Sequence, residues 1–346
     1  MNDTIITQNA DEALDKYLKE NQLRPAFLFT DKNVERRCLP IMTSLARLPR
    51  MAMTPGETNK TIATTEQLWT RLHEHQATRH SLLINLGGGI VSDLGGFAAA
   101  TFKRGIPFIN IATTLLAAVD ASIGGKTAIN MNGVKNEIGI FAWPLVTIVA
   151  LDTFATLPPE EYLSGYGEML KTAYLSGSPW LPKMLKEVPG QEELREMISQ
   201  CLAFKKEIVE KDPHETSLRK ILNLGHTVAH ALETLYLGRQ RTIPHGIAVA
   251  YGLLVMLIIS HLRLGLSTDW ITLHTRLLKE NFPPLSLTCE DYPLLLRAMH
   301  SDKKNRDSSR ILFTLLRAPG APEIDIEVSE EEVRTALDVM RDYLGI

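Results

Sequence analysis

Three histidines and one glutamate in the second half of the chain have the side chains of a zinc site. His226 and His230 are four positions apart, which places them on one face of a predicted helix. His245 begins a second apolar helix, and Glu168 lies in the segment GYGEMLK. Three protein ligands and one open position are typical of catalytic zinc. A single histidine is more often a core or surface residue, but this grouping of three favours a metal site. The spacing does not show which two of the three histidines would bind the metal.

Cations in the neighbouring predicted helices would make such a site attractive to anions. Lys171 lies one helical turn after Glu168, and Arg219 lies two turns before His226. Further polar and basic residues of this group are Lys205, Asn223, Lys303 and Lys304. Each one alone fits a solvated helix face equally well. Together, beside a metal, they suit a substrate with two or more negative charges.

Two glycine-rich segments in the first half could bind phosphate groups. Gly87–Gly89 connects a predicted strand to a helix, where backbone amides can approach a phosphate at the helix N-terminus. Asp93 could cap that helix or hydrogen-bond a ribose. The spacing departs from the G-x-G-x-x-G dinucleotide motif, so a tight strand–helix turn is an equally good interpretation.

The second segment, Asp120–Thr127, resembles a phosphate-binding loop but has Asp120 where that motif requires its first glycine. Lys126, together with Lys135 and Asn136 further on, suits an anionic substrate or a pyrophosphate. Exposed loop lysines explain the same spacing equally well.

The elements that must position these residues divide the chain near residue 159. Apolar runs at 26–30, 81–86, 107–112 and 145–150 predict buried strands that alternate with helices, which indicates a parallel sheet covered on both faces. Ligands of such sheets bind beyond the carboxyl ends of the strands. Residues 160–300 predict successive helices, followed by one strand at 310–316. We therefore expect a Rossmann-like α/β domain at 1–159 and an all-α domain at 160–346.

Composition excludes several classes of protein. The chain has 346 residues, 45% of them hydrophobic, with a net charge of −3 and no basic stretch typical of a nucleic-acid binder. Its three cysteines are far apart, which fits a reducing cytoplasm. The N-terminus lacks the pattern of a signal peptide. The apolar run 246–260 is shorter than the roughly 18–20 residues that span a bilayer, so we expect a buried core helix and no membrane partner.

Taken together, these segments resemble the 3-dehydroquinate synthase family of the sugar phosphate cyclase superfamily. The matching blocks run in family order from about residue 27 to residue 316: GGGIVSDLGGFAAATFKRG, ATTLLAAVDASIGGKTAIN, GVKNEIGIF, GYGEMLK, LRKILNLGHTVAH, PHGIAVAYG and DKKN. The resemblance implies an NAD-binding N-terminal domain, a helical metal- and substrate-binding C-terminal domain, and a homodimer. It implies the redox-neutral conversion of 3-deoxy-D-arabino-heptulosonate 7-phosphate, a small anionic sugar-acid phosphate, to 3-dehydroquinate and phosphate in the shikimate pathway.

The resemblance also assigns roles to individual residues. It makes Glu168, His226 and His245 the ligands of Zn²⁺ or Co²⁺, with His230 beside them as a substrate-contacting or proton-relay residue. The NAD-binding positions are Asp31, Asn33, Glu57, Lys60, Gly88, Gly89, Asp93, Thr113, Thr114, Asp120, Lys126, Lys135, Thr156 and Leu157. The catalytic and substrate-binding positions are Lys126, Lys135, Asn136, Lys171, Lys205, Arg219, Asn223, His230 and one or both of Lys303 and Lys304. Arg104 would reach the active site of a partner subunit.

Two positions depart from the family pattern. Ala112 replaces a proline before the paired threonines, and Ile247 replaces a glutamate that would support His245. Three alternatives stay open: a cyclase acting on another sugar phosphate, a metal-dependent polyol dehydrogenase that releases NADH, and a non-catalytic relative.

Overall fold

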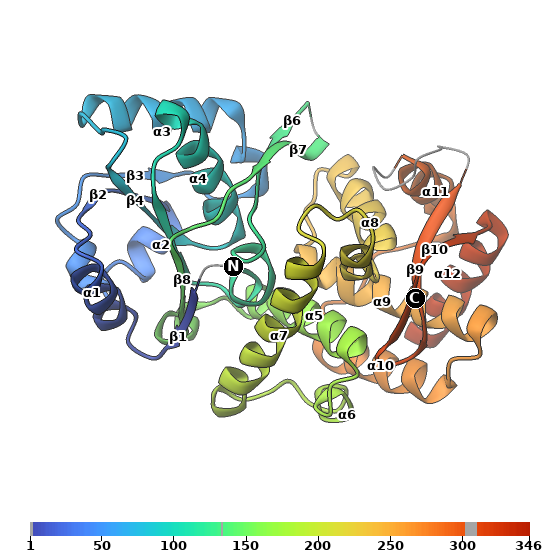
Figure 1. Ribbon diagram of the computed structural model, residues 1–346. Coiled ribbons are helices and arrows are strands. Elements are labelled where there is room, and N and C mark those ends of the chain that lie inside the picture. Colours follow the sequence, from blue (N-terminus) through green and yellow to red (C-terminus); the bar gives the residue numbers. More distant parts are fainter. Residues whose placement is uncertain (1–2, 133, 302–309) are drawn as a thin grey trace. The chain divides into compact units, whose positions relative to one another are not determined.

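The computed structural model describes residues 3–132, 134–301 and 310–346, apart from the side chains of residues 191 and 192 (Figure 1). Contacts between residues divide the chain into two compact units, with the division after Pro158. The roles of the two units stay predictions at this point: the first is expected to bind a dinucleotide, and the second a metal and the substrate.

A six-stranded parallel sheet forms the centre of the first unit. Its order is β1-β8-β5-β4-β2-β3, and every neighbouring pair is parallel. The strands are β1 (Asp3–Thr7), β2 (Pro25–Asp31), β3 (Arg50–Met53), β4 (Leu82–Gly87), β5 (Phe108–Ala112) and β8 (Val146–Ala150). The four strands expected from apolar runs are confirmed as β2, β4, β5 and β8. The sequence patterns missed β1 and β3, which are short strands at the two edges of the sheet.

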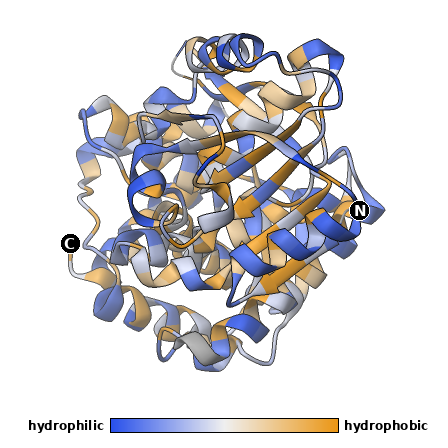
Figure 2. Ribbon diagram, turned by 90° about the vertical axis from the view of Figure 1, so that its left-hand side faces the viewer, coloured by the Kyte–Doolittle hydropathy of each residue, from blue (hydrophilic) through white to orange (hydrophobic). Residues whose placement is uncertain are grey.

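Helices cover both faces of this sheet, and alternation along the strands decides which side chains meet them. In β2, Leu28 packs with α1 (Ala10–Glu20) and α2 (Lys32–Arg37), whereas Phe27 and Phe29 pack with α3 (Ile62–Glu74) and α4 (Gly89–Thr101). Both faces of the strands are therefore apolar, which is why the strands read as continuous hydrophobic runs. Figure 2 colours the strands largely hydrophobic and the helices beside them in mixed colours.

The sheet has a topological switch point between β2 and β4, where the connections leave in opposite directions. The chain passes from β2 to β3, which is the edge strand next to it. From β4 it passes to β5, which lies on the opposite side of β4 from β2. Open α/β sheets bind ligands at such a point, beyond the carboxyl ends of the strands. Asp31 ends β2 there, and Gly87–Gly89 ends β4 and begins α4.

An antiparallel hairpin that the sequence patterns did not predict follows the second glycine-rich segment. It pairs β6 (Lys126–Met131) with β7 (Val134–Phe141), and residue Thr61 bridges to Asn130. Lys126 and Lys135, for which exposed loop positions were one of two interpretations, lie on these strands. Short helical turns complete the unit: η1 (Thr43–Leu45), η2 (Glu57–Asn59), η3 (Phe102–Arg104), η4 (Ala117–Ala121) and η5 (Leu151–Thr156).

The second unit is mainly helical, as expected, and also contains a β-hairpin. Its helices are α5 (Pro159–Ser176), α6 (Leu181–Met184), α7 (Gln191–Lys211), α8 (His226–Gly238), α9 (His245–Leu264), α10 (Thr268–Asn281), α11 (Tyr292–His300) and α12 (Glu330–Leu344), with short turns η6 (Leu218–Asn223) and η7 (Cys289–Asp291). The strand expected at 310–316 is β9 (Ile311–Ala318), which pairs with β10 (Ala321–Val328). The description of this unit as all-α therefore omitted one hairpin.

Helix α9 forms the core of the second unit. It packs against α5, α8, α10, α12 and β9, and every residue from Gly246 to Ser260 is buried. The helix is long and apolar enough to cross a membrane, but 78% of its most hydrophobic window is buried inside the structure. Its hydrophobicity therefore reflects packing within the protein.

A buried histidine in this core makes stability depend on pH. His274 is fully buried, its Nε2 lies 2.9 Å from the carbonyl oxygen of Ala250, and its Nδ1 lies 3.2 Å from the hydroxyl of Tyr174. The neutral ring satisfies both contacts, donating from Nε2 and accepting at Nδ1. Burial lowers the pKa of His274 to about 4.

We expect the second unit to lose about 2 kcal/mol of stability through His274 between pH 7 and pH 5. Because the folded pKa lies below the unfolded value near 6.5, the unfolded chain takes up a proton there that the folded chain does not. Urea unfolding of the wild type and of His274→Gln at pH 7, 6 and 5 measures this, since glutamine can make both contacts without titrating. Identical pH dependence in the two proteins would contradict the assignment.

Candidate functional site

Glu168, His226 and His245 converge in the second unit and can hold a metal ion. Glu168 lies on α5, while His226 and His245 are the first residues of α8 and α9. One ligand atom from each residue lies within 4.8 Å of the other two. The Nε2 atoms of His226 and His245 lie 3.6 Å and 3.4 Å from the same carboxylate oxygen, Oε1 of Glu168.

The opposite nitrogen of each ring faces a hydrogen-bond acceptor. Nδ1 of His226 lies 3.1 Å from the carbonyl oxygen of Leu224, and Nδ1 of His245 lies 3.2 Å from Oε1 of Glu233. When both Nδ1 atoms carry the proton, both Nε2 atoms offer a lone pair toward Glu168. Metal-binding histidines are usually oriented in this way. The donor set of two imidazoles and one carboxylate therefore fits a divalent cation such as zinc or cobalt.

A buried lysine balances the charge of Glu168. Nζ of Lys171 lies 2.5 Å from Oε2 of Glu168, and both side chains are almost completely buried. A buried carboxylate requires such a partner, because desolvating an unpaired charge costs several kcal/mol. Since Lys171 holds Oε2, the other oxygen faces the histidines.

Negative charge around His245 favours a bound cation or proton. Burial lowers the pKa of His245, but the carboxylates of Glu233 and Glu168 outweigh this effect and raise it to about 10. A divalent ion and a proton would therefore compete for Nε2 of this ring. The carboxylates of Glu168 and Glu233 therefore favour a positive charge at His245, whether it is a proton or a metal ion.

Glycines beside the ligands let the backbones of α5 and α9 touch. A Cβ atom on Gly246 would overlap the carbonyl oxygen of Ser164, and one on Gly167 would overlap the carbonyl oxygen of Gly246. The amide of Gly246 donates to the Ser164 hydroxyl at 3.0 Å, which satisfies one free N–H at the start of α9. Because Glu168 follows Gly167 and His245 precedes Gly246, this contact brings the two ligands together.

A second close contact positions His226. A Cβ atom on Gly252 of α9 would overlap the carbonyl oxygen of Gly225, the residue before His226. Gly225 has a φ of 77°, which favours glycine, and α8 begins directly after it. Helix α9 therefore fixes the backbone next to all three candidate ligands.

His230 and the segment before α8 add further functional groups. The His230 ring centroid lies 5.5 Å from that of His226 and 6.1 Å from that of His245. In η6, Arg219 is buried and donates to the carbonyl oxygen of Pro213 at 2.7 Å, while Asn223 donates to Glu215 at 2.9 Å. The structure thus places the His230 ring beside the rings of two candidate ligands, His226 and His245.

Asp212 holds the segment that carries Arg219. Its carboxylate accepts the backbone amides of Thr216, Ser217 and Arg219 at 2.8–3.0 Å. Burial raises the pKa of Asp212, but these hydrogen bonds outweigh it and lower the pKa well below the ordinary aspartate value. The residue acts as a local anchor for the polypeptide between α7 and α8.

The other predicted substrate residues of this unit are Lys205, Lys303 and Lys304. Lys205 is buried on α7. Lys303 and Lys304 lie outside the described residues.

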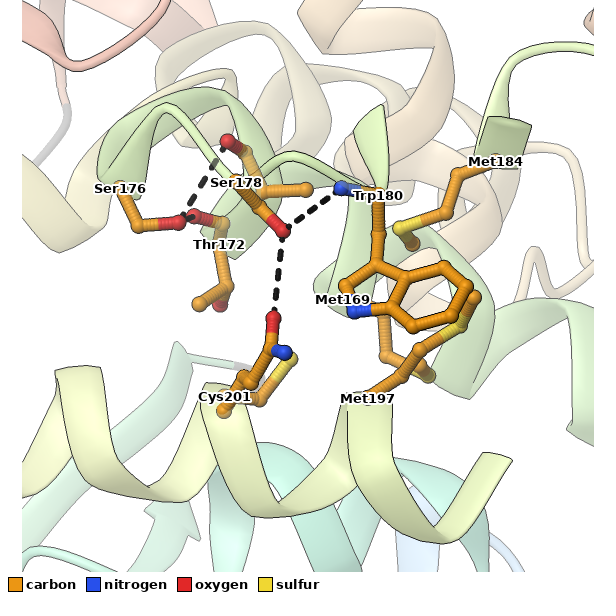
Figure 3. Close-up of a pocket in the computed structure, with 10 residues that line it drawn as sticks. Met169, Thr172, Ser176, Ser178, Trp180, Met184, Met197 and Cys201 are labelled. Atoms are coloured by element: carbon orange, nitrogen blue, oxygen red, sulfur yellow. Dashed lines mark hydrogen bonds between the residues drawn. The ribbon is translucent and has the colours of Figure 1, made fainter. Parts of the chain in front are cut away.

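A cavity of about 20 Å³ lies between α5, α6 and α7, lined by Met169, Met197 and Trp180 among others (Figure 3). A cavity of that volume holds about one water molecule and is too small for a sugar phosphate.

The candidate dinucleotide site of the first unit lies at the carboxyl ends of β4 and β5. A Cβ atom on Gly88 would lie 3.0 Å from the Thr114 side chain, so a glycine here lets the start of α4 pack closely against the segment that follows β5. The Thr113 hydroxyl is buried and has no hydrogen-bond partner within the described chain. An unsatisfied buried hydroxyl beside a glycine-rich helix start fits a ligand that offers hydrogen-bonding groups.

A buried lysine joins three of the predicted residues in this unit. Nζ of Lys60 lies 2.5 Å from Oδ2 of Asp93 and 2.5 Å from Oδ1 of Asn136. Burial raises the pKa of Asp93, and the Lys60 ammonium opposes that rise. Asn130 extends the network, since it donates to Glu57 at 2.8 Å and accepts the backbone amide of Asn136 at 2.8 Å. The hairpin β6–β7 is thereby tied to the loop that precedes α3.

The remaining predicted residues of the first unit lie at helix ends, in short helical turns and on the hairpin β6–β7. Asp31 caps α2, accepting the amides of Asn33 and Val34 at 2.8 Å and 3.0 Å. Thr156 accepts a hydrogen bond at its carbonyl oxygen from Arg37 at 3.0 Å. The others are Asp120 in η4, Lys126 on β6, Lys135 on β7, Arg104 in η3 and Leu157 after η5.

Three residues that position these sites escaped the sequence analysis: Glu233, Asn130 and Asp212. Glu233 carried a usable signal, because it lies seven positions after His226 and therefore on the same face of α8. Asn130 and Asp212 act through contacts with loops, which no periodicity reveals.

Comparison with known proteins gives consistent matches along most of the chain. Residues 50–164 match the family described as 3-dehydroquinate synthase N-terminal, and residues 165–305 match 3-dehydroquinate synthase C-terminal. A 3-dehydroquinate synthase of Parabacteroides distasonis is 39% identical, over 99% of this chain and 98% of its own length.

Solved structures of other cyclases share the fold. A 2-deoxy-scyllo-inosose synthase complexed with carbaglucose-6-phosphate, NAD⁺ and Co²⁺ has a TM-score of 0.84 at 22% identity, covering 98% of this chain and 96% of its own. The 2-epi-5-epi-valiolone synthase ValA of Streptomyces hygroscopicus subsp. jinggangensis, with NAD⁺ and Zn²⁺ bound, has a TM-score of 0.82 at 21% identity, covering 99% and 97%. The expected fold class is therefore confirmed.

We expect Gly246→Ala to separate α5 from α9 and to weaken metal binding at least 10-fold. The added methyl group cannot avoid the backbone of Ser164, so the fold should also lose about 1–3 kcal/mol, as is typical of overpacked cores. Zinc titration against a competing chelator and thermal unfolding measure both effects. Gly238→Ala is the matched control, because a Cβ atom there meets nothing within 4 Å. Unchanged affinity in Gly246→Ala would contradict the positioning role of this contact.

Proposed function

The chain belongs to the 3-dehydroquinate synthase family, and from this premise we infer that it converts 3-deoxy-D-arabino-heptulosonate 7-phosphate to 3-dehydroquinate and phosphate. This reaction belongs to the shikimate pathway, which leads to the aromatic amino acids. The observation that supports it most directly is the convergence of Glu168, His226 and His245 on one point of the helical unit.

Two bound groups would supply chemistry that the side chains lack. NAD provides a reversible hydride acceptor, so the reaction as a whole consumes no cofactor. A divalent ion, zinc or cobalt, provides Lewis-acid polarisation of substrate oxygens. We propose Glu168, His226 and His245 as its ligands, since their nitrogen and oxygen donors already face one another.

The cations of the second unit would bind the two anionic groups of the substrate. Lys171 and Arg219 are buried, so their charges act with little screening by solvent. Further hydrogen bonds to the substrate would come from Lys205 and Asn223 of the second unit and from one or both of Lys303 and Lys304. We also propose substrate contacts for Lys126, Lys135 and Asn136 of the first unit. Holding carboxylate and phosphate in one geometry lowers the barrier to each successive step.

His230 is the residue best suited to move a proton. It lies beside both histidine ligands, and its ring is only partly buried. Imidazole is the side chain that most often transfers protons in enzymes near neutral pH. We therefore propose a proton-relay role for His230 next to the substrate.

NAD would bind at the carboxyl ends of the parallel strands, near the switch point between β2 and β4. The amides of Gly88 and Gly89 would contact its phosphates, and Thr113 would use its unsatisfied hydroxyl. Hydroxyl and amide groups of the dinucleotide would meet Asp31, Asn33, Glu57, Lys60, Asp93, Thr114, Asp120, Thr156 and Leu157. Lys126 and Lys135 would contribute from the hairpin.

We also propose a homodimer in the cytoplasm, in which Arg104 reaches the partner's active site. Arg104 is exposed, and its φ of 67° follows the left-handed φ of 50° at Lys103. Two successive non-glycine residues in this region are energetically costly and are often found at functional positions. The backbone thus presents Arg104 outward at the end of α4.

Phosphate release from 3-deoxy-D-arabino-heptulosonate 7-phosphate tests the proposed function. The purified protein should release phosphate when NAD and zinc are present, without accumulation of NADH, and a chelator should stop the reaction. The His226→Ala variant should lose both bound zinc and turnover. Accumulation of NADH with simple polyols, and no phosphate release, would instead indicate a polyol dehydrogenase. Activity only with sedoheptulose 7-phosphate or glucose 6-phosphate would indicate a different cyclase.

We expect Lys126→Ala to lower kcat/KM by about 100-fold, as when one charged contact to a reacting group is removed. The side chain is exposed on β6, so the free energy of unfolding should change by less than about 0.5 kcal/mol. Steady-state kinetics and thermal unfolding measure the two effects. Lys16→Ala, an exposed lysine on α1, should leave both unchanged. A large fall in stability of Lys126→Ala would favour a structural role.

A further inference from the structure

We propose that Glu233 is a positioning residue for the metal site, whose carboxylate holds the Nδ1–H of His245 and so directs Nε2 of that ring toward Glu168. This inference rests on the proposed metal-binding function. It adds a residue outside the proposed ligand set. It also explains how a ligand at the partly exposed start of a helix is kept in one orientation.

The contacts of His245 define this role. Nδ1 lies 3.2 Å from Oε1 of Glu233, while Nε2 lies 3.4 Å from Oε1 of Glu168. The ring therefore spans two carboxylates with its two nitrogens. A carboxylate on the far nitrogen fixes the tautomer and ring orientation, and it makes the near nitrogen a stronger electron donor to a cation.

Helix α8 presents Glu233 together with two other residues of the site. His226, His230 and Glu233 are spaced by four and three positions, so they lie on one face of α8. Glu233 is 7% exposed, and a carboxylate this buried needs a hydrogen-bond donor. His245 supplies that donor from the neighbouring helix.

The two histidine ligands differ in how much support they need. The His226 side chain is 11% exposed and has a backbone carbonyl as its Nδ1 acceptor, whereas the His245 side chain is 29% exposed. A more exposed imidazole has more room to rotate away from a cation. Ile247, two residues later, is buried and apolar and offers no acceptor. The charged partner therefore comes from α8.

The test compares zinc and cobalt affinity of the full-length wild type with that of Glu233→Gln. Glutamine keeps the shape of the side chain and an acceptor oxygen but removes the charge. We expect the dissociation constant for Zn²⁺, measured against a competing chelator, to rise about 10- to 100-fold. The absorption spectrum of the Co²⁺-loaded protein should also change, because the geometry at His245 is altered.

Thr234→Ala is the matched control on the same turn of α8. Thr234 is exposed and its hydroxyl contacts only the backbone of its own helix at His230, so both metal affinity and the cobalt spectrum should stay as in the wild type. Thermal unfolding and NAD binding show whether each variant is folded. A folded Glu233→Gln protein with wild-type metal affinity and spectrum would overturn the proposal.

The wild type gives a second measurement that does not depend on folding of a variant. In zinc-loaded protein with ¹⁵N-labelled histidine, His245 should show a protonated Nδ1 with the downfield proton signal of a hydrogen bond to carboxylate. A His245 bound through Nδ1, or with no such proton, would contradict the role of Glu233. If the wild type binds neither Zn²⁺ nor Co²⁺, the proposed metal-dependent function fails, and this result is distinct from equal binding by wild type and variant.

Discussion

The backbone of α9 lies directly against α5 and against the start of α8, with no side chain between them. Gly246 meets Ser164 and Gly167 at the first contact, and Gly252 meets Gly225 at the second. Each candidate metal ligand is the chain neighbour of one of these glycines. The spacing of the ligand atoms is therefore set by backbone contacts, which tolerate much less movement than contacts between flexible side chains. The polar contacts of the site, from Lys171 to Glu233, act on a framework that these glycines have already fixed.

This arrangement also explains how a polar site can lie within an apolar helical unit. Helix α9 is buried along most of its length and supplies the hydrophobic contacts for four helices and one strand. Its polar start, His245, is the part that leaves the core. The parallel sheet of the first unit follows the same rule, because its strands are buried and its polar residues gather where the strands end. In both units the buried helices and strands form a rigid framework, and the polar residues of the candidate sites lie at the ends of these elements.

The buried parts of the fold were predictable from sequence, whereas edges and loops were not. Strands such as β4 are apolar on both faces and give a continuous hydrophobic run, but β1 and β3 are short edge strands with mixed burial. The hairpin β6–β7 has many exposed side chains, so its alternation was weak. The proposed metal ligands were found through residue type and resemblance to a family. Glu233 was not predicted, because it contacts His245 from another helix and lies 12 positions away in the sequence.

The ion pair between Lys171 and Glu168 has a consequence for how the protein matures. The lysine is an internal counter-ion that neutralises Glu168, the most deeply buried candidate ligand, before any metal arrives. Folding of this unit can therefore precede metal loading, in contrast to zinc fingers, whose chains stay unfolded until the ion binds. Metal removed by a chelator should leave a folded apoprotein that can be reloaded. The choice between zinc and cobalt in the cell would then follow the supply of each ion after synthesis and need not be decided during folding.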